Sequence, residues 1–175
     1  MDYIKIRLSN NQYYLQFRRV KKPISFTPDS DYILYIEFLN DLNQVILSIQ
    51  CSELEYYRAI ESLNFLNQEF FNEYGDNLHF ESTSLGSYYI TIEIKDPSIL
   101  SSDKLDLPYL DIDKEFLYYL LVIQNTEQGT ITRLYTEISL SDIENIAYNM
   151  FNLISDLPYL DNIRHKVNSY LILNP

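Results

Sequence analysis

Cys51 has the best position for nucleophilic chemistry in this 175-residue chain, because it directly precedes an expected helix start at Ser52. The partial positive charge at a helix N-terminus lowers the pKa of a thiol and favours the reactive thiolate. A base would also be needed, yet His79 and His165, the two histidines, are both distant in sequence. A small, buried residue at a strand end is the more common role of such a cysteine. We therefore expect Cys51 to be structural.

Three acidic residues, Asp111, Asp113 and Glu115, alternate along the chain as the first ligands of a calcium-binding loop do. Such a loop needs a glycine at its sharp turn, and Phe116 occupies that position. We interpret this segment as a solvated connector and predict no metal site in it.

The three glycines, Gly75, Gly86 and Gly129, fall at expected turns or at an expected helix end. None is left to build a phosphate-binding loop, which argues against nucleotide-binding classes of protein. His79 and His165 share no motif with each other or with a carboxylate, so the sequence contains no recognisable catalytic arrangement. The sequence predicts no cofactor and favours a protein that is not an enzyme.

Acidic residues dominate the chain, which has a net charge of −12 and a pI of about 4.4. Nucleic acid is therefore an unfavourable partner for the surface as a whole. Residues 1–22 hold six basic residues and one acidic residue, a net charge of +5. The other 153 residues hold 7 basic and 24 acidic residues, a net charge of −17. This asymmetry indicates an electrostatic partner.

Our first functional hypothesis is a non-enzymatic binding protein that acts through its acidic surface. Inhibitors and immunity proteins of phages and mobile elements often occupy a cationic groove in a nucleic-acid-handling protein. Carboxylates there compete for sites that normally bind phosphate, and charge attraction speeds association. The acidic residues that we expect to contact this basic protein partner are Glu81, Glu93, Asp111, Asp113, Glu127 and Glu137.

The first part of the chain alternates apolar and polar residues, which is typical of strands with one buried face. Ser52 and Glu55 then form an S-x-x-E capping box, and an apolar stripe with helical spacing follows up to Gly75. The expected strands are 3–8, 13–20, 32–39 and 44–50, and the expected helix ends at 75.

The second part of the chain repeats this order of elements. A second S-x-x-E box, Ser141 to Glu144, predicts the start of another helix. The expected strands are 78–84, 88–95, 116–124 and 130–139, and a further helix is expected over 159–173, with a strand at 169–173 as the alternative. The sequence therefore predicts an α+β fold: one integrated domain with an antiparallel sheet built from two ββββα repeats, 1–76 and 77–175, with helices on one face and a C-terminal helix.

A second functional hypothesis comes from the outward face of the first four strands, where cations alternate with aromatic rings. Cations bind phosphates and rings stack on bases in single-stranded nucleic-acid binding. Across about residues 3–155 the element order resembles that of the PUR and Whirly proteins, and this resemblance also implies single-stranded nucleic-acid binding. The alternative reading is that this face docks on the acidic second half or on a partner protein. The candidate residues are Lys5, Arg7, Tyr14, Arg18 and Tyr35.

The hexapeptide Asp-Leu-Pro-Tyr-Leu-Asp occurs twice without change, at 106–111 and 156–161. The copies are 50 residues apart, which does not match the spacing of the two predicted halves. We interpret both as proline-directed connectors whose Leu, Tyr and Leu side chains attach them to the core.

The longest apolar run, 116–123, is far too short to span a bilayer, and the N-terminus lacks the apolar region of a signal peptide. Cys51 is the single cysteine, so no internal disulfide can form. These features favour a cytoplasmic protein without membrane contact.

Overall fold

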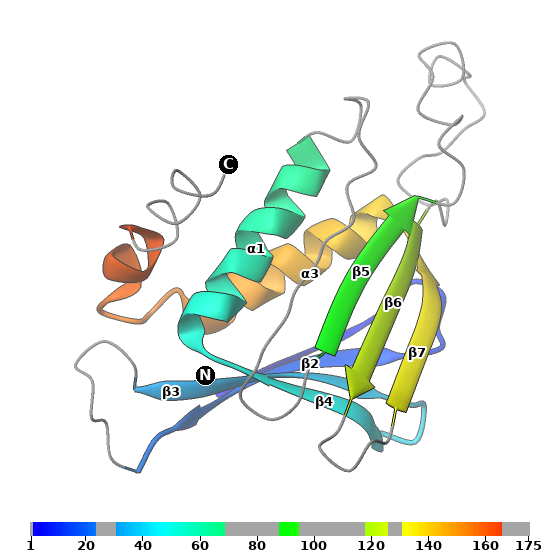
Figure 1. The fold of residues 1–175 in the computed structure, drawn as a ribbon, viewed down its shortest axis with the longest axis horizontal. Coiled ribbons are helices and arrows are strands. Elements are labelled where there is room, and N and C mark those ends of the chain that lie inside the picture. The colour runs from blue at the N-terminus through cyan, green and yellow to red at the C-terminus, as the bar shows by residue number, and fades with distance from the viewer. Residues whose placement is uncertain (1, 24–30, 69–87, 95–117, 126–130, 166–175) are drawn as a thin grey trace.

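Two antiparallel sheets and two long helices build the fold in a computed structural model, which describes residues 2–23, 31–68, 88–94, 118–125 and 131–165. Helices α1 and α3 lie on one side of the four-stranded sheet, and the three-stranded sheet stands beside them (Figure 1). The predicted α+β class is confirmed. The prediction of a single sheet is wrong for the described strands, because they form two separate hydrogen-bonded sheets.

The four-stranded sheet follows the predicted strands closely and has the strand order β1-β2-β3-β4. Asn11 and Asn43 lie in its hairpin turns with φ angles of 60° and 61°, a left-handed conformation that asparagine tolerates better than most residues. The inward side chains Leu15 and Phe17 are buried, as their alternation predicts. Its strands are β1 (Tyr3–Arg7), β2 (Tyr14–Lys21), β3 (Tyr32–Leu39) and β4 (Val45–Cys51).

The three-stranded sheet has the order β5-β6-β7, and all three strands match predicted ones. The fourth predicted strand of this half, 78–84, lies outside the described residues. The described order is therefore ββββα in the first half and βββα in the second. The strands are β5 (Tyr88–Ile94), β6 (Tyr118–Asn125) and β7 (Ile131–Ile138).

Helix α1 (Glu53–Gln68) begins at the predicted capping box. The backbone N–H of Ser52 donates to Glu55 Oε2 at 2.8 Å, and the N–H of Glu55 donates to Ser52 Oγ at 3.2 Å. Tyr56, Ala59 and Leu63 of the predicted apolar stripe are buried. The predicted helix end at Gly75 lies outside the described residues.

Helix α3 (Leu140–Ile154) begins two residues earlier than predicted. The prediction that Ser141 and Glu144 form its capping box is therefore wrong. Ser139 is the N-cap, and its backbone N–H donates to Asp142 Oδ2 at 2.9 Å. The other oxygen of Asp142 accepts hydrogen bonds from the backbone N–H and hydroxyl of Ser9 in the β1–β2 turn, at 2.9 and 2.7 Å. The contact with Ser9, which is distant in sequence, therefore favours Asp142 as the capping carboxylate of α3. A local sequence pattern cannot reveal such a contact.

Replacing Ser139 with alanine is expected to lower the free energy of unfolding by about 1–2 kcal/mol, because the helix loses its N-cap. Ser141→Ala is the matched control: it removes a hydroxyl that lies 2.8 Å from Ser139 Oγ but leaves the cap itself in place. Its expected effect is smaller, about 0.5 kcal/mol, because alanine is also a good helix former. Chemical denaturation followed by circular dichroism measures both values. Equal losses in the two variants would contradict the assignment of Ser139 as the N-cap.

One continuous hydrophobic core joins both sheets and both helices. Phe17 and Phe38 enter it from the four-stranded sheet, Val122 from the three-stranded sheet, and Tyr56 and Met150 from the helices. Described residues of both predicted halves therefore pack in one core. None of the helices in the described ranges is long and apolar enough to cross a membrane.

A third helical segment begins at residue 160 and runs to 165, the last described position before the C-terminus. This agrees with the predicted C-terminal helix over its first part. The remainder of that helix, and the alternative strand at 169–173, lie outside the described residues.

Candidate functional site

The five residues of the basic and aromatic face come together on the outer side of the four-stranded sheet. Arg7 pairs with Tyr14 across β1 and β2, and Arg18 pairs with Tyr35 across β2 and β3. The Lys5 Nζ lies 4.4 Å from the centre of the Tyr14 ring, and the Arg18 Cζ lies 4.2 Å from that of Tyr35. The rings that would stack on bases are therefore in contact with the chain's own cations.

Glu37 lies on the same outer face, and the sequence hypothesis did not include it. It is 5% exposed, although it points to the side of the sheet away from the helices. Arg18 donates to both of its oxygens, at 2.8 Å from Nη2 and 3.3 Å from Nε. Gln16 and Ser48 donate to the same carboxylate at 2.9 and 3.3 Å. Glu37 thus organises the centre of this face.

Burial on its own raises the pKa of Glu37, but the hydrogen bonds and charge of Arg18, with those of Gln16 and Ser48, outweigh it. The pKa of Glu37 therefore lies below its ordinary value, and the group is ionised at neutral pH. Its negative charge neutralises Arg18. The donors of an arginine guanidinium can bind a carboxylate or a phosphate in the same two-point manner. In this protein the Glu37 carboxylate already occupies those donors of Arg18, so they are not open to a phosphate.

The two remaining cations of this face also have partners within the chain. Lys5 donates a hydrogen bond to the Asn43 side chain. Arg7 donates to the backbone oxygen of Asn11 at 3.3 Å and lies 3.9 Å from Asp41. These contacts are exposed and weak, so they compete little with a ligand. The sequence therefore predicted the grouping of these side chains correctly but not their internal pairing.

The acidic residues of the first hypothesis fall mostly outside the part of the chain that the structure describes. Glu137 lies on β7 and is exposed. Glu93 belongs to β5, but its side chain is not among those described. The four others, Glu81, Asp111, Asp113 and Glu127, lie in undescribed segments. The expectation that these six residues form one acidic surface stays a prediction.

The exposed face of β7 combines charge with aromatic surface around Glu137. Arg133 and Tyr135 are exposed on the same side of this strand, and Tyr135 has 55% of its surface exposed. Its ring stacks on that of Tyr119 in β6, with 4.8 Å between the ring centres. A stacked tyrosine pair beside an exposed acid is a suitable contact surface for a protein partner.

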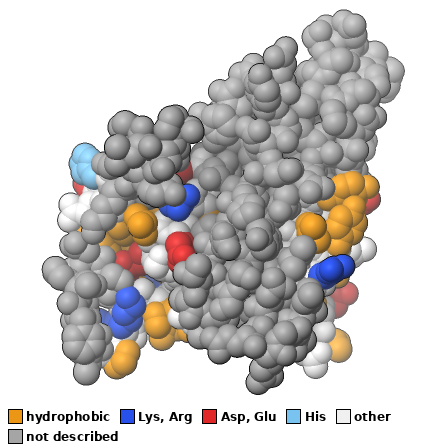
Figure 2. Space-filling view, in the orientation of Figure 1, with side chains coloured by type: hydrophobic (Ala, Val, Ile, Leu, Met, Phe, Trp, Pro, Cys, Tyr) orange, Lys and Arg blue, Asp and Glu red, His pale blue; other side chains and the backbone are white. Residues whose placement is uncertain are grey.

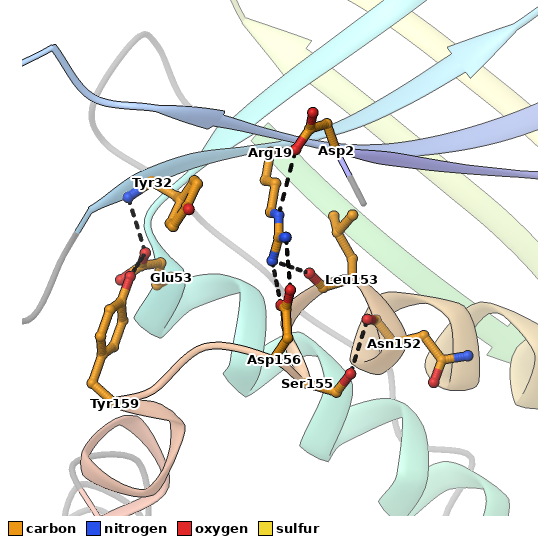
Figure 3. Close-up of polar contacts among 9 residues, drawn as sticks. All are labelled: Asp2, Arg19, Tyr32, Glu53, Asn152, Leu153, Ser155, Asp156 and Tyr159. Atoms are coloured by element: carbon orange, nitrogen blue, oxygen red, sulfur yellow. Dashed lines mark hydrogen bonds and ion pairs between the residues drawn. The ribbon is translucent and has the colours of Figure 1, made fainter.

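Arg19 is a buried cation on the inner face of the four-stranded sheet, and only 7% of its side chain is exposed. It donates to the backbone oxygen of Leu153 at 2.9 Å and, through Nη2, to Asp156 Oδ2 at 2.9 Å (Figure 3). Its Nε lies 4.0 Å from Asp2 Oδ1. Arg19 thereby binds the C-terminal end of α3, where a positive charge is favourable.

Glu53, the first residue of α1, is the second buried charged group that joins distant segments. Its Oε1 accepts hydrogen bonds from the Tyr159 hydroxyl at 2.6 Å and from the backbone N–H of Tyr32 at 3.0 Å (Figure 3). Burial raises the pKa of Glu53, and the hydrogen bonds from Tyr159 and Tyr32 offset part of that shift. The hydroxyl oxygen of Tyr159 also accepts from the backbone N–H of Asp31 at 3.3 Å.

The sequence hypotheses did not single out Arg19, Glu37 or Glu53. The signal for Arg19 was available, because the alternation that places Leu15 and Phe17 inward also places Arg19 inward. A charged residue on a core-facing position requires a partner. The partner itself, Asp156, is 137 residues away and could not be found from local pattern.

Cys51 is buried at the end of β4, and its thiol donates to the backbone oxygen of Leu34 at 3.6 Å. Burial and then the negative charge of Glu55 raise the pKa of this thiol far above its ordinary value. The expected effect of the helix N-terminus is therefore outweighed by desolvation. Of the histidines considered as its base, His165 is exposed and His79 lies outside the described residues.

Alkylation of Cys51 is expected to be at least about a hundredfold slower in the native protein than in the denatured protein, because the thiol is buried and protonated. A maleimide reaction at neutral pH, with and without denaturant, measures the two rates. Native and denatured rates within a factor of about two would contradict a structural role.

Among the residues in the described ranges, no group of three or more His, Cys, Asp or Glu side chains could hold a metal ion. The calcium-loop pattern at Asp111, Asp113 and Glu115 lies in an undescribed segment. On the face in Figure 2, the visible Lys and Arg side chains of the described residues lie apart from one another and do not form one continuous patch.

No model of a known protein family matches the chain, and a search of curated proteins finds no match to its sequence. A proposal of function therefore rests on the charges and contacts of the described residues.

Proposed function

We propose that this protein is a non-enzymatic acidic binding protein that occupies a cationic surface of a nucleic-acid-handling protein. The observation that supports this best is the internal use of the N-terminal positive charge. Glu37 binds Arg18, Asp156 binds Arg19 and Asp41 lies 3.9 Å from Arg7, so at least three of the six basic residues in 1–22 are paired with the chain's own carboxylates. This pairing weakens the basic patch of the four-stranded sheet. A basic partner is then attracted by the net charge of −12 with little opposing repulsion from that sheet.

The binding mode would be electrostatic steering followed by contact of carboxylates with lysine and arginine side chains. Complementary charge accelerates the encounter, and each carboxylate takes a position that a phosphate would otherwise hold. The exposed Glu137 and the Tyr119–Tyr135 pair offer one described part of such a surface. A cytoplasmic location, as the sequence indicates, would place the protein with such partners.

Affinity capture from cell lysate tests the proposal, with the immobilised protein washed at low salt. The retained proteins are expected to be basic and to be released both by about 0.5 M salt and by added double-stranded DNA. DNA is the informative competitor because it binds the cationic groove rather than the acidic protein.

Two variants with the same change in net charge sharpen this experiment. The first variant should abolish capture, and it changes Glu93, Glu127 and Glu137 to glutamine. The second variant should leave capture intact, and it changes Asp41, Glu144 and Asp161 to the corresponding amides. Capture that is indifferent to salt, to DNA or to the choice between these variants would contradict the proposal.

Single-stranded nucleic-acid binding is the second candidate, and one observation favours it. Lys5, Arg7, Tyr14, Arg18 and Tyr35 do lie on one sheet face, as such binding requires. The buried carboxylate of Glu37 reduces the positive charge of that face, which is why we place this function second.

We also propose that the two halves arose by duplication of a ββββα unit. In both halves the N-cap serine directly follows the last strand residue: Ser52 follows Cys51, and Ser139 follows Ile138. The helix N-cap therefore has the same position relative to the last strand in both halves, which supports a duplication. A cap at Ser141 would have differed from Ser52 in this position.

A further inference from the structure

We propose that Arg19, Glu53 and the apolar surface between them form a docking site for the sequence Asp-Leu-Pro-Tyr-Leu-Asp, and that both copies of this sequence are ligands of the site. In the structure, residues 156–161 occupy it. Residues 106–111 have the identical sequence and are the second ligand, in competition with the first. This inference is independent of the proposed function.

The first recognition element is the Asp156 carboxylate. Arg19 donates to both of its oxygens through its two terminal nitrogens, and the same guanidinium binds the backbone oxygen of Leu153. Arg19 is almost fully buried, whereas 61% of the Asp156 side chain is exposed. The site therefore presents a fixed cation, and the peptide supplies an accessible anion to it.

The second recognition element is the hydroxyl of Tyr159, which donates to the buried carboxylate of Glu53 at 2.6 Å. The second oxygen of Glu53 is buried and has no hydrogen-bond partner among the residues that the structure describes. Among the described residues, Lys22 and Asp31 contribute charge at Glu53, and the Arg19 guanidinium lies 5.2 Å from the ring of Tyr32. A phenylalanine in place of Tyr159 would leave Glu53 buried with one donor fewer.

Apolar contacts complete the recognition of this hexapeptide. Leu157 and Leu160 are buried and belong to the hydrophobic core, while Pro158 and Asp161 are exposed. The groups that the site contacts are therefore the first, second, fourth and fifth residues of the hexapeptide. All four are present in residues 106–111 as Asp106, Leu107, Tyr109 and Leu110.

The copy at 156–161 has the advantage in this competition because it directly follows α3, whose last residue is Ile154. A short tether gives it a high effective concentration at the site. Weakening the contacts of this copy should therefore open the site to the other copy, or to the same sequence supplied as a free peptide.

The test is a titration with the capped synthetic peptide Asp-Leu-Pro-Tyr-Leu-Asp, followed by the NMR shift of the Tyr32 amide, which binds Glu53. The full chain is compared with the variant Asp156→Asn/Tyr159→Phe. The variant is expected to bind the peptide at least about tenfold more tightly than the original chain. A peptide with phenylalanine in place of tyrosine should bind less well.

The role of residues 106–111 is tested by adding Asp106→Asn and Tyr109→Phe to that variant. Removal of the competing copy is expected to tighten peptide binding further, by about threefold or more. No increase would overturn the assignment of 106–111 as a ligand, and no binding to either variant would overturn the docking site itself.

Two further measurements keep the test decisive if the double substitution impairs folding. Tyr159→Phe alone conserves the packed ring and should give an intermediate gain in peptide affinity. Arg19→Lys in the double variant keeps the charge but removes the two-nitrogen contact, and it should abolish the gain. Peptide binding that is unchanged by Arg19→Lys would contradict the proposal.

Discussion

Replacing Arg19 with methionine is expected to lower the free energy of unfolding by about 2–3 kcal/mol. Methionine keeps most of the apolar stem of the arginine, so the loss comes from the guanidinium contacts. The backbone oxygen of Leu153 and the carboxylate of Asp156 both lose a charged donor, and the C-terminal end of α3 loses its cation. Chemical denaturation measures the effect.

Asp156→Asn is the control for this prediction, because it keeps an oxygen acceptor while removing the ion pair. Its expected loss is smaller, about 1 kcal/mol, since Asp156 is largely exposed and the arginine still binds Leu153. A loss for Arg19→Met that is no larger than that for Asp156→Asn would show that Arg19 does not anchor α3.

The same ion pair predicts a pH dependence of stability. The hydrogen bond from Arg19 lowers the pKa of Asp156 below its ordinary value. The contribution of this ion pair to the free energy of unfolding is therefore complete above the ordinary carboxyl pKa. It disappears as the pH falls through the lowered, folded-state pKa of Asp156. Arg19→Met should lose less stability over this acidic range than the original chain does.

Replacing Glu37 with glutamine is expected to lower the free energy of unfolding by about 2 kcal/mol and to change the charge of the outer sheet face. Arg18 loses its ionised partner, and the hydrogen bonds from Gln16 and Ser48 become weaker because their acceptor is neutral. The freed arginine joins Lys5 and Arg7, so the variant should gain weak, salt-sensitive binding to single-stranded DNA.

Denaturation and oligonucleotide binding measure the two consequences separately. Gln16→Ala is the control: it removes one donor to Glu37 but leaves the charge pair intact, so no DNA binding should appear. Because the pKa of Glu37 is lowered, its contribution to stability should be complete above the ordinary carboxyl pKa and should be lost as the pH falls through the lowered, folded-state pKa. A Glu37→Gln protein as stable as the original would contradict this role.

Local pattern was sufficient for most of the described strands and for the first helix start. Alternation placed Leu15 and Phe17 inward and Lys5 and Arg18 outward, and Ser52 marked the beginning of α1. Such signals depend on neighbours within four residues and can therefore be read from the sequence.

Contacts between distant segments explain what the sequence could not show. Asp142 caps α3 partly because Ser9 binds its other oxygen. Because of this contact, α3 begins before the predicted box at Ser141 and Glu144. The pairing of Glu37 with Arg18 needed the register of β2 and β3. The repeated hexapeptide was correctly expected to attach to the core at 157–160, but its anchors were unknown until the fold placed them.

Oligonucleotide binding at low salt tests most directly the choice between the two candidate functions, the acidic surface or the basic sheet face. Fluorescence anisotropy with a labelled, mixed-sequence single strand at about 20 mM salt is the measurement, since low salt favours every phosphate contact. We predict no binding by the original chain, because Glu37 neutralises Arg18 and the net charge is −12. Binding by the original chain that disappears when Lys5, Arg7 and Arg18 are changed to glutamine would contradict our account.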